Sequence, residues 1–138
     1  MELITDRTEA DVLLGNEKGK YRYSDLNRVE KAVEDLRELV KQLDFYPKLI
    51  TKTNWGDPGV FSIDHWPTNA QLTRYLKNVT TLCDLVMVEA GGIPQSPDHW
   101  DWEDANAIEK ALQDVYLRVM GVISTFRYSG ELYAGDYL

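Results

Sequence analysis

Apolar residues recur at three- and four-residue steps in three long segments, and this spacing constrains the fold more than any other feature of the sequence. The first segment begins at Ser24, the second at Thr68 and the third near Asp101. This period places the apolar side chains on one face of an amphipathic helix. The three stripes are Leu26, Val29, Val33, Leu36, Val40 and Leu43; Leu72, Tyr75, Leu76, Val79, Leu82, Cys83 and Val86; and Ile108, Ala111, Leu112, Val115, Val119, Val122, Ile123 and Phe126.

Helix-end signals accompany these stripes. Thr68 is followed three residues later by Gln71, the spacing of a capping box. The glycine pair at 91–92 predicts the end of the second helix. A shorter helix is expected over residues 7–14, with Asp6 as its cap and Gly15 at its exit.

These elements predict an all-α chain, and 138 residues have room for a single domain. We expect an N-terminal helix and loop over residues 1–22, a three-helix bundle in up-down-up order over 23–127, and an extended arm over 128–138. Two connections, 44–66 and 92–100, are long for such a bundle. Within the first, residues 48–53 alternate enough to allow a short strand.

Charge and cysteine content exclude several classes of function. Fifteen Lys and Arg against 23 Asp and Glu give a net charge of −8, so we expect no nucleic-acid partner and no anionic membrane surface. A single cysteine, Cys83, excludes an internal disulfide and every multi-cysteine zinc site. The charged N-terminus and the short apolar runs predict neither a signal peptide nor a membrane span.

Candidate catalytic groups are sparse. The stretch 98–104 gathers His99 and four carboxylates, types that ligate cations or act as acid and base. No His-x-x-x-His, calcium-loop or nucleophile-elbow spacing accompanies them, and acidic residues are common at helix starts. Cys83 falls on an apolar stripe, which favours a buried thiol. We therefore expect no catalytic residue, no metal and no cofactor; a small hydrolase built on the 98–104 cluster is the weaker alternative.

One short motif occurs twice. Residues 25–35 align without gaps on residues 104–114, with identities at Asp, Asn, Glu, Lys, Ala and Asp. Recurring helix-start chemistry explains such a match. A functional surface shared by the first and third long helices is the alternative.

Four tryptophans lie in or beside the two long connections, at Trp55, Trp66, Trp100 and Trp102. Exposed, they would stack on a sugar or anchor a protein partner. Buried, they would close gaps between helices and loops.

The last residues carry a tandem Tyr-(Ser/Ala)-Gly-(Glu/Asp) pattern that starts at Tyr128 and Tyr133. Glycine breaks helices and tyrosine favours strands, so an extended arm is expected. The candidate partner contacts on it are Tyr128, Leu132, Tyr133 and Tyr137, joined by Trp55, Trp100 and Trp102 from the loops. The arm either docks on a neighbour or folds back over its own helices.

Several segments together resemble one family. Ile4-Thr-Asp-Arg-Thr, Ser24-Asp-Leu-Asn-Arg-Val29, Pro67-Thr-x-x-Gln-Leu72 and Tyr128-Ser-Gly-Glu-Leu-Tyr133 are similar, in this order, to small proteins encoded among the tail and baseplate genes of phages and prophages of Gram-positive bacteria. The short connection at residues 16–20 departs from that pattern, in which a tryptophan-bearing acidic stretch is inserted.

The resemblance implies a non-enzymatic structural protein. Its partners would be other phage tail or baseplate proteins, with self-association as an option, and it would reside in the host cytoplasm during assembly and then in the virion. The alternative is an accessory domain that recognises a glycan or a protein through the tryptophan-bearing loops.

Overall fold

In a computed structural model, the described part of the chain is helical and contains no strand. The helices are α1 (Glu9–Leu14), α2 (Tyr23–Val40), the short 3-10 helix η1 (Lys41–Leu43), α3 (Asn69–Leu85) and α4 (Trp102–Asp136). The structure describes the backbone of residues 1–136 except 17, 20, 53, 57–66 and 90, and side chains through residue 125. The all-α prediction is confirmed.

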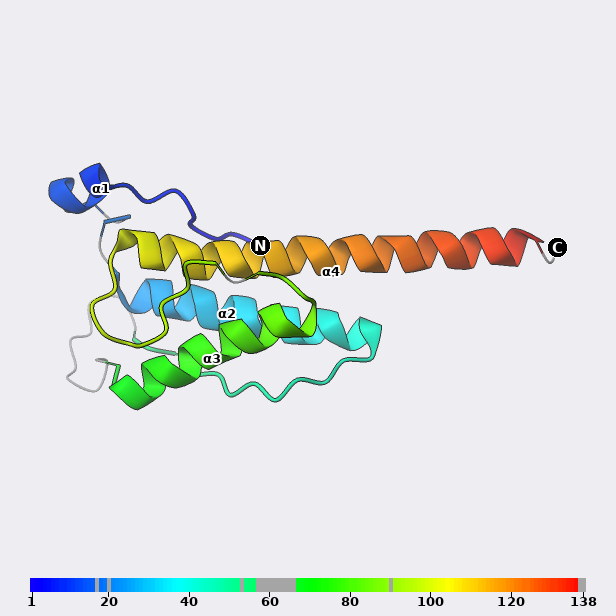
Figure 1. Ribbon diagram of the computed structural model, residues 1–138, viewed down its shortest axis with the longest axis horizontal. Helices are drawn as coiled ribbons and strands as arrows, with labels where there is room; N and C mark the ends of the chain where they lie inside the picture. The colour runs from blue at the N-terminus through cyan, green and yellow to red at the C-terminus, as the bar shows by residue number, and fades with distance from the viewer. Residues whose placement is uncertain (17, 20, 53, 57–66, 90, 137–138) are drawn as a thin grey trace.

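The three long helices run in the same direction, so the up-down-up order is wrong. Figure 1 shows α2, α3 and α4 beginning at one end of the molecule. Contacts agree with this direction. Arg74, in the first half of α3, pairs with Glu30, in the first half of α2 (2.8 Å), while Val86, just past the end of α3, accepts a hydrogen bond from Arg118, near the middle of α4 (3.2 Å). Parallel neighbours require connections that return the full length of a helix. The two long connections serve this purpose.

The core lies where the three long helices meet, each in contact with the other two. Every described residue of the three predicted stripes is buried or packs against the core, except Val122, which is partly exposed. Outside the stripes, Leu49, Trp55 and Ile93 join the core from the connections. Burial of apolar surface of this kind is the main source of stability.

Helix ends follow the predicted chemistry in part. Thr68 and Gln71 form the predicted capping box of α3, and Gly15 ends α1 with a left-handed φ of 64°. The cap of α1 is Thr8, not Asp6, because the Thr8 hydroxyl accepts from the Asp11 N–H while the Asp11 carboxylate accepts from the Thr8 N–H. The predicted stop of α3 at residues 91–92 is also wrong, since α3 ends at Leu85.

The expected extended arm over 128–138 is wrong for the residues described. α4 continues as a helix to Asp136 and runs well beyond α2 and α3 (Figure 1). Each glycine in a helix costs only about 1 kcal/mol relative to alanine, so Gly130 does not by itself end a helix already propagating through residue 129. Among the described residues, no helix combines the length and apolarity that a membrane span requires.

Candidate functional site

Near the ends where the long helices begin, side chains of α4 and of α2 each bind the backbone of an extended segment. We call these two sets of contacts the first and the second clasp. In the first, Glu109 and Asn106 on α4 hold the extended segment 4–7. The Glu109 carboxylate accepts from the Ile4 N–H (3.1 Å), and the Asn106 amide accepts from the Arg7 N–H (3.0 Å) and donates to the Arg7 carbonyl (2.9 Å). The segment is thereby fixed antiparallel to α4.

The first clasp contains a buried charge cluster of two arginines and two carboxylates. Arg7 pairs with Glu109 (2.6 Å) and Asp25 (3.2 Å), and Arg28 pairs with the same two carboxylates, both at 2.6 Å. Glu109 is fully buried and Asp25 nearly so. The formal charges cancel, which is the condition under which charges are tolerated in an interior. Burial alone would lower the pKa of Arg28, but the hydrogen bonds to Glu109 and Asp25 outweigh it and raise that pKa above its ordinary value.

The second clasp repeats the first on α2. Glu30 accepts from the Lys52 N–H (2.7 Å), and Asn27 accepts from the Trp55 N–H (2.7 Å). Glu30 also accepts from the Trp55 indole N–H (3.3 Å) and pairs with Arg74 from α3. This clasp fixes the returning connection antiparallel to α2.

The two clasps explain the repeated sequence motif. Asn27 and Glu30 occupy the positions of Asn106 and Glu109 in the aligned copies. In each copy the two side chains, three residues apart on the helix, bind backbone N–H groups three residues apart on an extended segment. Both copies lie at the same end of the parallel pair α2 and α4, and the chemistry they share is backbone binding within the chain.

The buried carboxylates are committed to structure. No buried side-chain nitrogen or oxygen among the described residues lacks a hydrogen-bond partner. Glu30 and Glu109 each bind an arginine and a backbone N–H, so both carboxylates make contacts within the chain.

The 98–104 stretch is built as a helix start. Asp101 and Asp104 cap each other's backbone N–H groups at 3.0 and 2.9 Å. Throughout the described part of the chain, no three His, Cys, Asp or Glu side chains come together as metal ligands. His65, the other histidine, lies outside the described residues.

Cys83 is buried in the core, as its place on the stripe indicates. Burial, assisted by the nearby negative charges of Asp84 and Asp114, raises the pKa of its thiol to about 11. At neutral pH the thiolate, which is the reactive form, is scarce.

The tryptophans divide into two environments. Trp55 is 0% exposed, so the expectation that it contacts a partner is wrong: its indole seals the second clasp, beneath the Lys52 ammonium at 4.3 Å. Trp100 and Trp102 are partly exposed and line a pocket of about 340 Å³ together with Tyr21. Trp66 lies outside the described residues.

That pocket adjoins a hydrogen-bonded pair of phenols, of which Tyr75 is buried and Tyr21 is 37% exposed. Tyr21 shares a hydrogen bond with Tyr75, and Trp100 packs against both rings at centroid distances of 6.1 and 6.0 Å. Burial raises the pKa of both hydroxyls. The two phenols therefore stay protonated near neutral pH, and Tyr21, which lines the pocket, contributes a neutral side chain to it.

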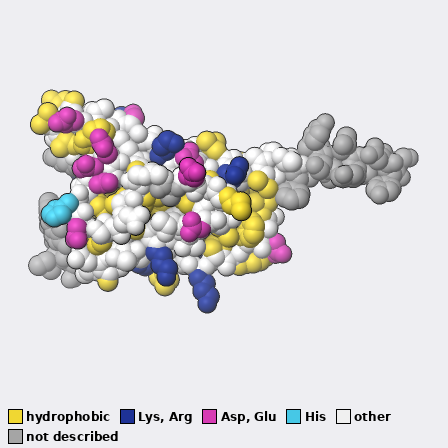
Figure 2. All heavy atoms as spheres, viewed as in Figure 1, with side chains coloured by type: hydrophobic (Ala, Val, Ile, Leu, Met, Phe, Trp, Pro, Cys, Tyr) yellow, Lys and Arg dark blue, Asp and Glu magenta, His cyan; other side chains and the backbone are white. Residues whose placement is uncertain are grey.

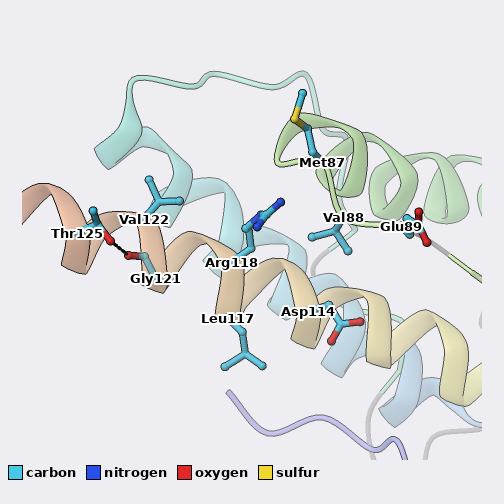
Figure 3. Close-up of a pocket in the computed structure, with 9 residues that line it drawn as sticks. All are labelled: Met87, Val88, Glu89, Asp114, Leu117, Arg118, Gly121, Val122 and Thr125. Carbon is cyan, nitrogen blue, oxygen red and sulfur yellow. Dashed lines mark hydrogen bonds between the residues drawn. The ribbon is translucent and has the colours of Figure 1, made fainter.

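A larger surface groove, about 870 Å³, lies between the end of α3 and the middle of α4. Figure 3 shows Arg118 reaching from α4 toward the turn that carries Met87, with Glu89 and Asp114 at one end and Thr125 toward the other. Met87 and Leu117 are 84% and 57% exposed. In Figure 2, hydrophobic side chains gather on the visible face at the end of the body from which α4 projects.

Sequence reasoning missed the clasps and the groove. Arg7, Glu30 and Glu109 carry charges that pattern alone assigns to solvent, although the repeated motif contains both glutamates. No sequence pattern around Met87 or Leu117 indicated that these residues line a groove. Of the predicted contacts at the C-terminus, the backbones of 128, 132 and 133 lie within α4, and Tyr137 lies outside the described residues.

Comparison with known proteins adds no relative to this picture: the chain matches no family model, no curated protein and no solved structure.

Proposed function

We propose that this chain is a non-enzymatic structural protein that acts through protein–protein contacts. The observation that carries the proposal is the length of α4. It has 35 residues, about 52 Å at 1.5 Å per residue, against 18 residues for α2. Ile123 is the last residue of α4 in the described core. The helix continues from there to Asp136, a further length of about 20 Å.

The helical segment beyond Ile123 would gain stability by packing against a partner. Most helical stability in proteins comes from tertiary packing, and glycines at 130 and 135 weaken the intrinsic helix propensity of this segment. The sequence from 126 to 133, Phe-Arg-Tyr-Ser-Gly-Glu-Leu-Tyr, has four large apolar or aromatic residues and two charges. Such a composition suits a helix covered by a partner.

The setting we propose follows from the family resemblance. A phage or prophage tail or baseplate would contain this chain beside other tail proteins, with assembly in the host cytoplasm before incorporation into the virion. In a repeated assembly, individually weak contacts act together. A rigid body with one projecting helix suits such a part.

Two experiments test this function. Peptide mass spectrometry on density-purified particles from an induced host should find the chain at a fixed ratio to the major tail protein. Truncation after residue 127 should leave the melting transition of the body within a few degrees, since no described core residue follows Ile123, and should abolish co-purification with tail proteins. Absence from particles while the protein is abundant in the lysate would contradict the proposal.

The pocket beside Trp100 and Trp102 supports a second candidate, an accessory domain that binds a glycan or a protein. Its size, about 340 Å³, falls in the range of small-ligand sites. Glycan-array binding that Trp102→Ala abolishes, and Tyr46→Ala on another exposed surface does not, would favour this candidate.

A further inference from the structure

The turn after α3 holds a methionine where glycine is preferred. Met87 has a left-handed φ of 59°, and its N–H bonds to the Asp84 carbonyl (3.3 Å) while the next N–H, of Val88, bonds to the Cys83 carbonyl (2.9 Å). Non-glycine residues pay about 1 kcal/mol or more for this conformation. The side chain gains little packing in return, since it is 84% exposed. A strained, exposed methionine fits a role in contact with something outside the chain.

The groove next to Met87 is open along α4. Its α4 residues run from Asp114 to Thr125, about 16 Å or three helical turns. A Cβ built on Gly121 meets nothing within 4 Å, so a partner backbone can approach there closely. Met87, Val88, Leu117 and Val122 supply apolar surface. These dimensions match a helix laid in a groove.

The charges around the groove select the partner. Glu89 and Asp114 line the groove at the same end, and Asp84 lies in the adjoining turn, where its carbonyl accepts from the Met87 N–H. Asp84 and Glu89 form no ion pair among the described residues, and Asp114 pairs there only with exposed Lys110. Arg118 also lines the groove and keeps its positive charge, although its Nε–H donates to the neutral Val86 carbonyl. The three carboxylates outnumber the two cations, Arg118 and Lys110, so the rim carries a net negative charge on a chain with net charge −8.

We propose that this groove binds an amphipathic helix of about three turns from another protein, with apolar residues at i, i+3 or i+4 and i+7 and with Lys or Arg on its flanks. The inference rests on the proposed function and names the chemistry of one partner. A second copy of this chain carries the same net charge of −8, so repulsion between like charges disfavours it as the partner.

The test uses the full chain and two fluorescent 14-residue model peptides, one of leucine and lysine in amphipathic order and one with glutamate replacing lysine. Anisotropy should show the basic peptide binding and the acidic peptide at least tenfold weaker. Met87→Gly should weaken the basic peptide while leaving the melting temperature unchanged or higher, because glycine relieves the left-handed strain. Leu117→Ser should weaken it about tenfold.

The matched control is Tyr46→Ser, which removes a large residue whose exposure (68%) lies between those of Leu117 and Met87 and which does not line the groove. If Met87→Gly and Leu117→Ser both bind the basic peptide as tightly as the wild type, the proposal is overturned and the affinity comes from the net negative charge of the chain. Concentration-dependent dimerisation that Leu117→Ser abolishes would overturn it in favour of a second copy. If particles contain the groove variants at wild-type copy number, the groove proposal is refuted and the structural function stands. If the chain binds the basic peptide through the groove but is absent from particles, the structural function is refuted and the groove proposal stands.

Discussion

Replacing Glu109 by glutamine tests whether the first clasp holds the fold through its charge. Glutamine keeps the shape and still accepts from the Ile4 N–H, but Arg7 and Arg28 are left with one carboxylate, Asp25. Removing one partner from a buried ion pair typically costs about 3 to 5 kcal/mol. The Arg28 side chain is 23% exposed, so water compensates part of its lost partner. We expect a loss at the lower end of that range, about 3 kcal/mol.

A loss of this size is a large fraction of the free energy of unfolding of an ordinary domain, which is about 5 to 15 kcal/mol. For a chain of this length it lowers the melting temperature by roughly 10 °C. Urea unfolding followed by far-UV circular dichroism measures the free energy directly. The control is Asp35→Asn, which removes the exposed Lys31–Asp35 pair and should change stability by less than about 0.5 kcal/mol.

A double-mutant cycle separates charge from shape. Arg7→Met alone leaves two carboxylates facing Arg28, whereas Arg7→Met combined with Glu109→Gln leaves the neutral pair Asp25 and Arg28. The double variant should therefore lose about 1 to 3 kcal/mol less than the sum of the single variants. Additive losses, or a Glu109→Gln variant as stable as Asp35→Asn, would refute the account of the cluster as a balanced charge unit.

Two further predictions concern the clasps and the thiol. Asn27→Ala and Asn106→Ala should each cost about 1 to 3 kcal/mol in urea unfolding, because each leaves a backbone N–H without its acceptor; amide exchange should accelerate at Trp55 in the first variant and at Arg7 in the second, and exchange at wild-type rates would contradict the clasp. Cys83 keeps its proton in the folded state to a pKa of about 11, against 9.0 without burial, so between pH 9 and 11 the unfolded chain binds fewer protons and stability falls as pH rises. The loss by pH 11 is about 1 to 3 kcal/mol, and Cys83→Ala should show a shallower decline over that window; equal slopes for the two proteins would show that the thiol does not contribute.

The positions of the helices could be predicted from the sequence because they depend on the local residue pattern. The relative directions of the helices could not be predicted from that pattern. The stripes and the Thr68 capping box are set by residues within a few positions of one another. The order of the helices depends on where the connections run, and a short loop joins only antiparallel neighbours. The connection from Asp44 to Thr68 is long enough to return along the whole of α2. Its length was the signal against the up-down-up order.

The candidate site was less accessible to sequence reasoning for a related reason. Hydrogen bonds between a helix side chain and a backbone N–H that is 22 or 105 residues away carry no local periodicity. Buried Glu30 and Glu109 resemble solvent-facing glutamates until the arginines that neutralise them are located. The repeated Asn-x-x-Glu spacing was the one visible trace.

The clasps also explain why α4 extends beyond the packed core of the molecule while α2 does not. α2 is followed by its own extended segment, and the chain must turn back at Asp44, in a left-handed conformation with φ 64°, to lay that segment along the helix. α4 receives its extended segment from residues 4–7 instead. Neither clasp requires the chain to reverse after α4, so the helix is free to continue past Ile123. By this reasoning the repeated motif, although structural, leaves the last third of α4 beyond the described core, where we propose that a partner binds.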